Sequence, residues 1–347
     1  MTTVIWSTES VDTSAMLLAQ ALDDVVFTKD AELRDEELKV IASDLENHII
    51  FYGAVNIPEW FIRDGNLNND RVFNSPTVTK KFSNRNTVAE TLSLHNINTL
   101  IYKKINAETS YNSLKEVLGQ KFDLVVKNGM NVIDTVKNRE EYLQKRVGAY
   151  YACKHLDAVM KIRLFCGLPD LTDEGLIGIL VSEKRMLSFL EMLTYGSSAD
   201  VKHHIEQMFL DGHLTEAMGE GKTKEAWTEI KFIGSKQIEE NLKIKLKNIA
   251  AVLQTIFGVV GKPDFLAVDI VQTANGELYV TNTTTSPSLT NDNVLQSTAS
   301  YFDSLIKEGR KMTKERFFKI VQNLTDEQVI SAAKLLKQEG LLVTSRV

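Results

Sequence analysis

The N-terminal part of the chain alternates short apolar runs with longer helix-like segments. The predicted elements are strands at 4–6, 25–28 and 48–52 and helices at 13–22 and 35–45. Strands that alternate with helices predict a parallel sheet, and a ligand crevice can form at the C-terminal edge of such a sheet. No GxGxxG motif follows Trp6, so the sequence does not indicate a dinucleotide site at this edge.

A second region begins near Arg71. Its predicted elements are helices at 84–95 and 138–147, strands at 99–102 and 124–126, and two strands within 150–168 that are joined near Asp157. The strand at 124–126 leads directly into Lys127. A lysine in this position is usually a solvated residue at a sheet edge, and the alternative is a phosphate ligand that reaches into a cleft.

A long helix and a hairpin follow. Apolar residues at helical spacing predict one buried helix face, made of Leu246, Ile249, Ala250, Leu253, Ile256 and Phe257. An apolar strand at 265–271, a turn at 273–276 and an alternating strand at 277–280 predict a β-hairpin. Antiparallel pairing can bring Asp269 and Asn282 together. An isolated aspartate in an apolar strand needs a partner or an ion, so Asp269 is the strongest candidate for a functional residue.

The segment 280–290, VTNTTTSPSLT, is rich in hydroxyl groups and carries no charge. It directly follows the predicted hairpin, so it ends a folded unit and is either a linker or a site. Beyond it, helices are predicted at 301–309, at 314–323 and from a capping box at 325–328 to Gly340. Residues 301–347 are therefore a predicted helical appendage that can cover the core, bind a second copy or receive a partner.

Composition narrows the class of protein. The chain has 347 residues, of which 43% are hydrophobic and 25% charged, which predicts a soluble protein of two or three lobes. A net charge of −6 argues against a general nucleic-acid surface. Cys153 and Cys166 lack metal-site spacing and are expected to be reduced, partly buried thiols, which favours a cytoplasmic location.

Several motifs are excluded. The N-terminus lacks the pattern of a secretion signal, and the apolar stretch 249–271 is interrupted by polar residues and Pro263, so no membrane span is predicted. GEGKT at 219–223 resembles the end of a phosphate-binding loop, but Glu216 stands where that motif needs its first glycine. A solvated loop is the expectation there.

The order of these parts resembles the ATP-grasp superfamily. The features are a helix after an Asn-containing turn with an early lysine, a strand ending in lysine, a strand pair with an arginine, a long helix and the pattern GxxDxxxVDxV…GxLYVxNxTxSPSLT. The resemblance covers roughly residues 70–300 and is greatest to amide-forming ligases such as glutathione synthetase, D-alanine–D-alanine ligase and the glutamate ligase that acts on a ribosomal protein.

The resemblance implies a mixed α/β and α+β fold. The implied units are an N-terminal α/β lobe at 1–75, a small lobe at 76–150, a large lobe with the metal-site hairpin at 151–300 and the helical appendage at 301–347. In this family ATP lies between the two α+β lobes, and Mg²⁺ bridges its phosphates to acidic residues on the last hairpin. A substrate carboxylate becomes an acyl phosphate, which an amine attacks.

The resemblance also implies roles for individual residues. Lys81 and Lys127 match the two nucleotide-contacting lysines, and Lys154, His155 and Leu156 match the hinge that binds adenine, with Asp157 near the ribose. Arg163 matches an arginine near phosphate or substrate, although it could equally pair with a neighbouring carboxylate. Asp269 matches the first metal-binding acid. From the sequence itself, His155 has no acidic partner at ligand spacing and is expected to be satisfied or exposed.

The chain departs from the family at two places. Asn282 stands in place of the usual metal-binding Glu and Thr284 in place of the usual Asn, and the loop after Lys127 contains one glycine, Gly129. Neutral oxygen donors weaken Mg²⁺ binding, and a short loop wraps an anion poorly. Two hypotheses result: a carboxylate–amine ligase that uses ATP, Mg²⁺ and a carboxylate-bearing substrate, or an ATP-grasp-like scaffold without chemistry that binds a nucleotide or a protein or peptide partner. A homo-oligomer fits either one.

Overall fold

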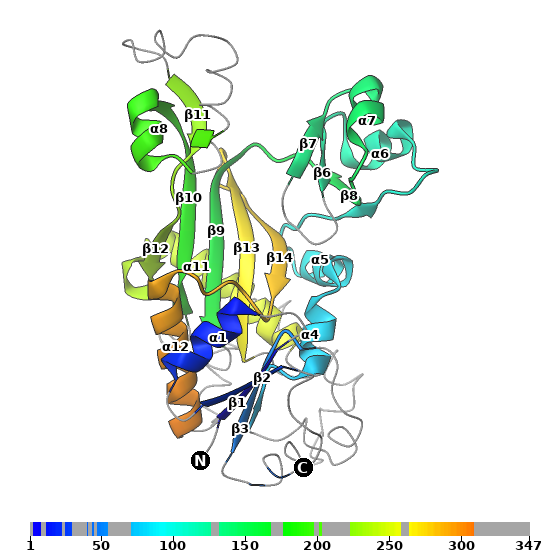
Figure 1. Cartoon of the computed structure of the whole chain (residues 1–347). Helices are drawn as coiled ribbons and strands as arrows, with labels where there is room; N and C mark the ends of the chain where they lie inside the picture. The colour runs from blue at the N-terminus through cyan, green and yellow to red at the C-terminus, as the bar shows by residue number, and fades with distance from the viewer. Residues whose placement is uncertain are drawn as a thin grey trace, which may run out of the picture.

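The computed structural model of the chain describes residues 3–7, 12–22, 25–29, 40, 44, 47–54, 71–125, 132–167, 176–197, 201–202, 223–257 and 264–308. Within these residues the strands form three sheets, which we call the N-terminal, small and large sheets (Figure 1). No helix in the described ranges is long and apolar enough to cross a membrane.

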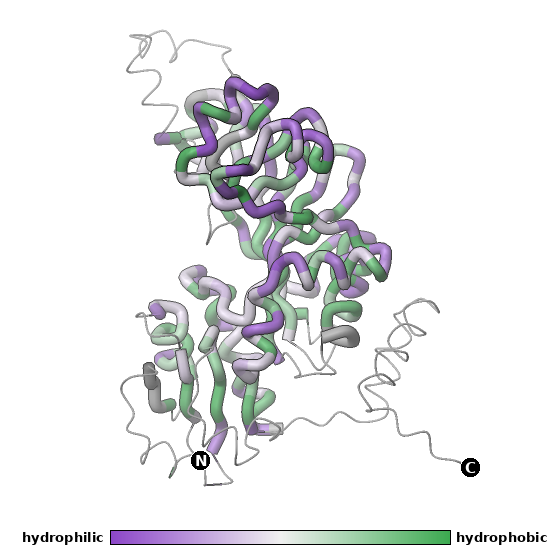
Figure 2. The backbone as a smooth tube through the Cα atoms, turned by 90° about the vertical axis from the view of Figure 1, so that its right-hand side faces the viewer, coloured by the Kyte–Doolittle hydropathy of each residue, from purple (hydrophilic) through white to green (hydrophobic). Residues whose placement is uncertain are grey.

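The N-terminal sheet is parallel, as predicted. It contains β1 (Thr3–Ser7), β2 (Val25–Lys29), β3 (His48–Tyr52) and β4 (Val72–Phe73) in the order β2-β1-β3-β4. Helix α1 (Thr13–Ala21) begins where the Asp12 carboxylate accepts hydrogen bonds from the N–H groups of Ser14 and Ala15. Figure 2 shows that the backbone near the N-terminus is coloured largely as hydrophobic, in keeping with buried strands. The helix predicted at 35–45 lies mostly outside the described residues.

Two short helices lead from the N-terminal sheet to the small sheet. Helix α4 (Pro76–Phe82) starts with a proline in its first turn, and α5 (Arg85–Leu94) is capped by the Asn84 side chain, which accepts from the N–H of Thr87. Both helices bury apolar side chains in one core with the large sheet; these are Val78, Phe82, Val88 and Leu92. The predicted helix at 84–95 is confirmed.

The small sheet is antiparallel, with the order β5-β8-β6-β7. Its strands are β5 (Lys103–Lys104), β6 (Phe122–Val125), β7 (Val132–Val136) and β8 (Tyr151–Lys154), and α6 (Tyr111–Leu118) and α7 (Arg139–Lys145) belong to the same unit. The strand predicted at 99–102 is wrong. The N–H of Leu100 donates to the carbonyl of Val280, and Thr99 forms an isolated bridge to the same residue, so this segment pairs with the large sheet instead.

The large sheet has the order β11-β10-β9-β13-β14, and β12 also pairs with β10. Its strands are β9 (Ala158–Gly167), β10 (Leu176–Ser188), β11 (Thr223–Trp227), β12 (Lys231–Gly234), β13 (Phe265–Thr273) and β14 (Leu278–Thr284). The associated helices are α8 (Phe189–Tyr195), the 3₁₀ turn η2 (Ser235–Gln237) and α11 (Glu240–Phe257). The predicted hairpin is therefore confirmed, with longer strands than expected. The GEGKT segment lies almost entirely outside the described residues.

The two faces of the large sheet are covered differently. One face packs on α11, and this core joins Ile162, Leu164, Val268, Ile270, Leu246, Ile249, Ala250 and Leu253. The predicted face of α11 is thus buried as far as its side chains are described. On the opposite face, Phe165 and Phe265 pack with α1, the N-terminal sheet and Phe302 of the last helix. Figure 1 shows α1 and α12 in front of the lower part of the sheet and α11 behind it.

The last described helix, α12, runs from Asp292 to Glu308. The helix predicted to start at Tyr301 therefore begins earlier, and the predicted domain boundary at residue 300 falls inside it. Phe302 and Leu305 are buried in the core with the N-terminal sheet, so residues 301–308 belong to that core and not to an appendage. The other predicted boundaries stay predictions, and residues 309–347 lie outside the described ranges.

Candidate functional site

A row of three polar side chains crosses the central strands of the large sheet. Asp269 on β13 is the register partner of Arg163 on β9 and of Asn282 on β14. Because side chains alternate along a strand, the row lies on the face opposite to Val268 and Ile270, which pack on α11. The sequence analysis expected Asp269 and Asn282 to meet, and it left open whether Arg163 joins a carboxylate.

The row is held by charged hydrogen bonds. Arg163 donates from Nε to Asp269 Oδ1 at 2.6 Å and from Nη2 to Asp269 Oδ2 at 3.2 Å, and Asn282 Nδ2 donates to the same Oδ2 at 3.2 Å. The Asp269 side chain is 8% exposed and that of Arg163 29%. This two-pronged pairing satisfies the buried carboxylate that the sequence required to have a partner.

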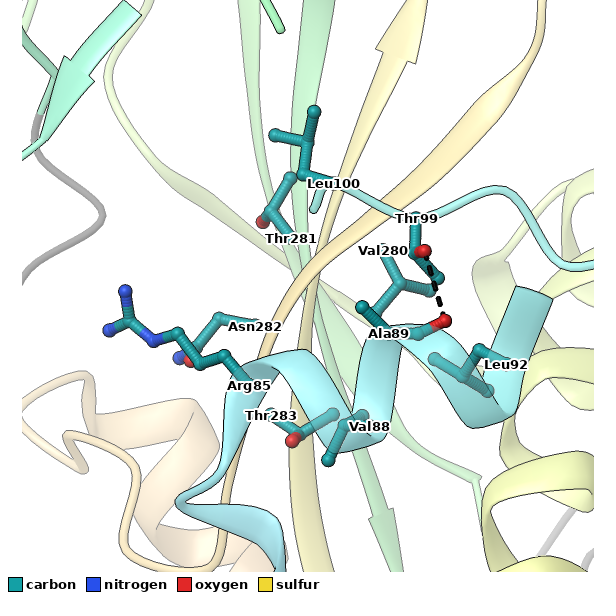
Figure 3. Close-up of a pocket in the computed structure, with 10 residues that line it drawn as sticks. All are labelled: Arg85, Val88, Ala89, Leu92, Thr99, Leu100, Val280, Thr281, Asn282 and Thr283. Carbon is teal, nitrogen blue, oxygen red and sulfur yellow. Dashed lines mark hydrogen bonds between the residues drawn. The ribbon is translucent and has the colours of Figure 1, made fainter. Parts of the chain in front are cut away.

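A pocket at the start of α5 includes one residue of this row, Asn282. Arg85 is the first residue of that helix, and it lines the pocket together with side chains of α5, the segment 99–100 and β14. Figure 3 shows the Arg85 side chain extending past Asn282, with Val88 and Leu92 further along the same helix. The lining residues are Arg85, Val88, Ala89, Leu92, Thr99, Leu100, Val280, Thr281, Asn282 and Thr283.

Tyr102 joins this pocket to the small sheet. Its hydroxyl donates to the carbonyl of Thr281 at 2.9 Å, its ring packs with Val125 and Cys153, and the Arg85 guanidinium lies 5.5 Å from the ring centre. Burial raises the pKa of Tyr102 well above its usual value, and the nearby Arg85 partly opposes this rise. Tyr102 is therefore a neutral, fixed contact between the small and large sheets.

The linker 154–157 connects β8 of the small sheet to β9 of the large sheet. Within it, His155 Nδ1 lies 2.8 Å from Asp123 Oδ1 on β6, and His155 Nε2 lies 3.0 Å from Asp157 Oδ1. Thr135 on β7 also donates to Asp123 Oδ1, at 2.7 Å, and Lys121 reaches Asp157 at 3.4 Å. The hydrogen bond from His155, followed by the charge of Lys121, lowers the pKa of Asp157. His155 is satisfied, as expected, but by two carboxylates that the sequence analysis did not identify.

The other predicted nucleotide residues are spread along the chain. Lys154 is exposed at the end of β8, and Leu156 is partly exposed, with its carbonyl accepting from the N–H of Ala158. Lys81 lies in the last turn of α4, one helix before the pocket. Lys127 and the loop containing Gly129 lie outside the described residues.

Arg85 is the residue that the sequence analysis missed. The signal was present, because a cation in the first turn of a helix is disfavoured by the helix dipole. Arg85 directly follows the capping residue Asn84, and the first turn of α5 contains no acidic residue. Its guanidinium lies over the Tyr102 ring and lines the pocket.

The residues at the predicted metal positions do not fit a magnesium site. Both oxygens of Asp269 already accept N–H groups of Arg163, and Asn282 turns its N–H₂ group toward Asp269. Thr284 Oγ1 accepts from the N–H of Ser286. No group of three or more His, Cys, Asp or Glu side chains in the described part of the chain is placed to hold a metal. A hard cation needs oxygen lone pairs directed at it, and here they are directed at N–H donors.

Comparison with known proteins gives matches by structure. No protein-family model matches the chain, and no curated protein matches it by sequence. The D-alanine–D-alanine ligase of Bacillus anthracis has a TM-score of 0.54 and 12% identity, with 96% of this chain and 99% of that chain covered. D-alanyl-alanine synthetase A of Vibrio cholerae has a TM-score of 0.56 and 10% identity, with 88% and 98% covered.

A third solved structure is that of the ATP-grasp ligase PsnB with a minimal precursor, Mg and ADP. Its TM-score is 0.51 at 12% identity, with 87% of this chain and 97% of that chain covered. Each match covers nearly the whole length of the solved structure, so the similarity includes the arrangement of all the sheets and not of a single lobe. The chain therefore has the ATP-grasp fold, as its motifs predicted.

Proposed function

We propose that the chain binds ATP where α5, the hairpin β13–β14 and the linker 154–157 meet, and that it uses ATP to join a carboxylate to an amine. The observation that carries this proposal is the Arg163–Asp269–Asn282 row together with Arg85. The row and Arg85 come from segments distant in sequence, and the fold brings them to one place. The fold of ATP-dependent ligases supports the reaction class, as an argument from analogy.

We propose that ATP lies with its adenine at the linker and its phosphates at the arginine side chains. The backbone of Lys154–Leu156 contacts the adenine, Asp157 lies near the ribose, and the phosphates extend toward Arg163 and Arg85. In the row itself, Arg163 pairs with the carboxylate of Asp269, and Arg85 lines the adjoining pocket. Guanidinium groups suit a polyphosphate, which arginine binds through paired hydrogen bonds.

The proposed reaction has two balanced steps. A carboxylate oxygen of the substrate attacks the γ-phosphorus of ATP, the bond from that phosphorus to the β–γ bridging oxygen breaks, and ADP leaves. The amine nitrogen of the second substrate then attacks the acyl carbon, phosphate leaves and the nitrogen loses a proton. The protein mainly positions the reactants and stabilises the transferred phosphoryl group. The PsnB structure contains Mg and ADP, but no step is assigned to magnesium here because the donor set does not fit it.

The proposed substrates are defined by two functional groups. One substrate carries a carboxylate, and the acceptor is an amine. The PsnB structure is a complex with a minimal precursor. We propose carboxylates of proteins and peptides as the first substrates to test.

The test combines nucleotide binding with trapping of the acyl phosphate. The full chain is titrated with ATP by calorimetry and then incubated with ATP, a pool of carboxylates and hydroxylamine. Because hydroxylamine converts acyl phosphates to hydroxamates, the proposal expects ATP binding and hydroxamate formed together with ADP. The Arg163→Lys variant is expected to lose most of the product. Absence of ATP binding at millimolar concentration contradicts the proposal.

A second candidate is a scaffold that binds a nucleotide or a protein partner without chemistry. The Asp269–Arg163 pair favours it, because a carboxylate engaged by an arginine is withdrawn from the metal position. The same experiment separates the two functions. Tight ATP binding without ADP or hydroxamate, across carboxylates that include peptides, selects the scaffold.

A further inference from the structure

We propose that this site binds the polyphosphate of its nucleotide as a metal-free anion, held directly by Arg163 and Arg85. This inference rests on the proposed function, namely that ATP binds at the Arg163–Asp269–Asn282 row. It differs from the expectation set by the fold, in which a divalent cation bridges the phosphates to carboxylates of the hairpin.

The first reason is the state of Asp269. Its two oxygens accept from Nε and Nη2 of Arg163, and Oδ2 also accepts from Asn282 Nδ2. For a cation to use this carboxylate, it must displace a guanidinium from a side chain that is 8% exposed. The displaced Arg163 would then lie beside the incoming cation, and the two positive charges would repel.

The second reason is the chemistry of the neighbouring positions. Asn282 and Thr284 are neutral, and the N–H₂ group of Asn282 faces the carboxylate. On the strand itself, the residues two positions before and after Asp269 on the same face are Ala267 and Val271, which offer no side-chain oxygen. On the described strands β13 and β14, the row therefore provides one carboxylate, and Arg163 already engages it.

The third reason is the number of cations. Arg85 approaches the same site from α5 and lines the pocket with Asn282. Its guanidinium lies 5.5 Å from the centre of the Tyr102 ring. Arg163 and Arg85 thus bring two guanidinium groups to the hairpin end of the site, and such groups bind phosphate oxygens directly.

The Asp269→Asn substitution is expected to change the ATP affinity in opposite directions at an anion site and at a magnesium site. At an anion site, Asp269 competes with phosphate for the N–H groups of Arg163, so a neutral side chain of the same shape frees that guanidinium. ATP is then expected to bind several-fold more tightly. At a magnesium site the same substitution removes the only carboxylate and weakens binding.

The experiment is calorimetric titration of the full chain with ATP, in excess EDTA and in excess MgCl₂. We expect an affinity in EDTA at least equal to that in magnesium, and a several-fold gain for Asp269→Asn in EDTA. Binding that requires magnesium overturns this inference but leaves ATP binding intact. Binding in neither buffer overturns the proposed function itself, so the two failures are distinguishable.

Two further variants complete the test. Asp303→Asn removes an exposed carboxylate that pairs with Lys307 on α12, away from the row, and its ATP affinity is expected to equal that of the wild type. Arg163→Lys keeps one charge but loses the fork of donors, and we expect weaker binding in EDTA. An Asp269→Asn gain that Asp303→Asn reproduces overturns the inference. If Asp269→Asn does not fold, the wild-type comparison between EDTA and magnesium decides alone.

Discussion

Asn74 and Asp264 bind each other's backbone at the junction of the N-terminal sheet and the hairpin. The N–H of Asn74 donates to Asp264 Oδ2 at 2.9 Å, and the N–H of Asp264 donates to Asn74 Oδ1 at 2.8 Å. The Asn74 amide also accepts from the N–H of Phe265 and donates to its carbonyl. Since β13 begins at Phe265 and carries Asp269, this exchange anchors the strand that positions the site.

Asn74 is therefore expected to be a large contributor to stability. Asn74→Ala leaves buried N–H groups of Asp264 and Phe265 without their acceptor, at a cost of about 1–3 kcal/mol each. Asn74 has a φ of 50°, so alanine adds backbone strain of about 1 kcal/mol that glycine avoids. Urea unfolding should rank the free energy of unfolding as wild type, then Asn74→Gly, then Asn74→Ala.

Asn96 provides the matched control. It has a φ of 58° but is exposed, so its substitution tests the backbone strain without the buried hydrogen bonds. Asn96→Ala should cost about 1 kcal/mol and Asn96→Gly less. Equal losses at positions 74 and 96 would show that the anchor at Asp264 adds no stability.

Arg85 should contribute more to ATP binding than Lys81. A charge-assisted hydrogen bond contributes about 1.5–3 kcal/mol, so Arg85→Gln is expected to weaken ATP binding by roughly 10- to 100-fold. Lys81 lies on the preceding helix, and Lys81→Gln is expected to change the affinity by less than about threefold. Both affinities are measured by titration of the full chain with ATP. A larger effect at Lys81 would mean that Lys81, as the family resemblance implied, and not Arg85, is the main nucleotide-binding cation.

The His155 contacts should fix the linker between the small and large sheets. Asp123 is buried and shared by His155 and Thr135, so Asp123→Asn is expected to lower the free energy of unfolding by about 2 kcal/mol. Asp157 is exposed, and Asp157→Asn should cause a smaller loss. In a double-mutant cycle, Asp123→Asn should couple to His155→Gln more strongly than Asp157→Asn does, and equal coupling would argue against a buried clamp.

Local patterns were sufficient to predict much of this fold. The apolar run at 265–271, the turn at 273–276 and the alternation at 277–280 predicted the hairpin, and antiparallel pairing placed Asn282 beside Asp269. The parallel N-terminal sheet followed from strands that alternate with helices. Cys153 and Cys166 are free and buried, as their lack of spacing indicated. In each case the pattern that supports the prediction is local in the sequence.

Other features depended on contacts between distant segments. The pairing of β9 with β13 decides that Arg163 meets Asp269, and no local pattern specifies that register. His155 contacts Asp123 on β6, and the elements β7, α7 and β8 separate the two residues in the chain. The segment around Thr99 looks like a strand of the small sheet but pairs with Val280, because a short apolar run does not encode its partner. Lys81 was selected by a motif, whereas the fold brings Arg85 to the row.

Acid should destabilise the protein through His95. This side chain is buried at the end of α5, and burial lowers its pKa from the usual 6.5. Below pH 6.5 the unfolded chain binds a proton that the folded chain does not. The free energy of unfolding therefore falls as the pH decreases from 6.5 toward the folded pKa, by up to about 1.4 kcal/mol per pH unit for one group. Above 6.5 this contribution is fully present and constant.

The measurement is urea unfolding at pH 7.5, 6.5 and 5.5 for the wild type and for His95→Gln. The variant should show a shallower slope below pH 6.5, whatever its loss of packing at pH 7.5. Burial and the charge of Arg71 also lower the pKa of His48. His48 should therefore supply part of the pH dependence of the free energy of unfolding that remains in His95→Gln. Adding His48→Gln to that variant tests this contribution. Asp157, with its pKa below 3.8, acts only at lower pH. Identical slopes for the wild type and His95→Gln would mean that His95 accepts its proton in the folded state as readily as in the unfolded one.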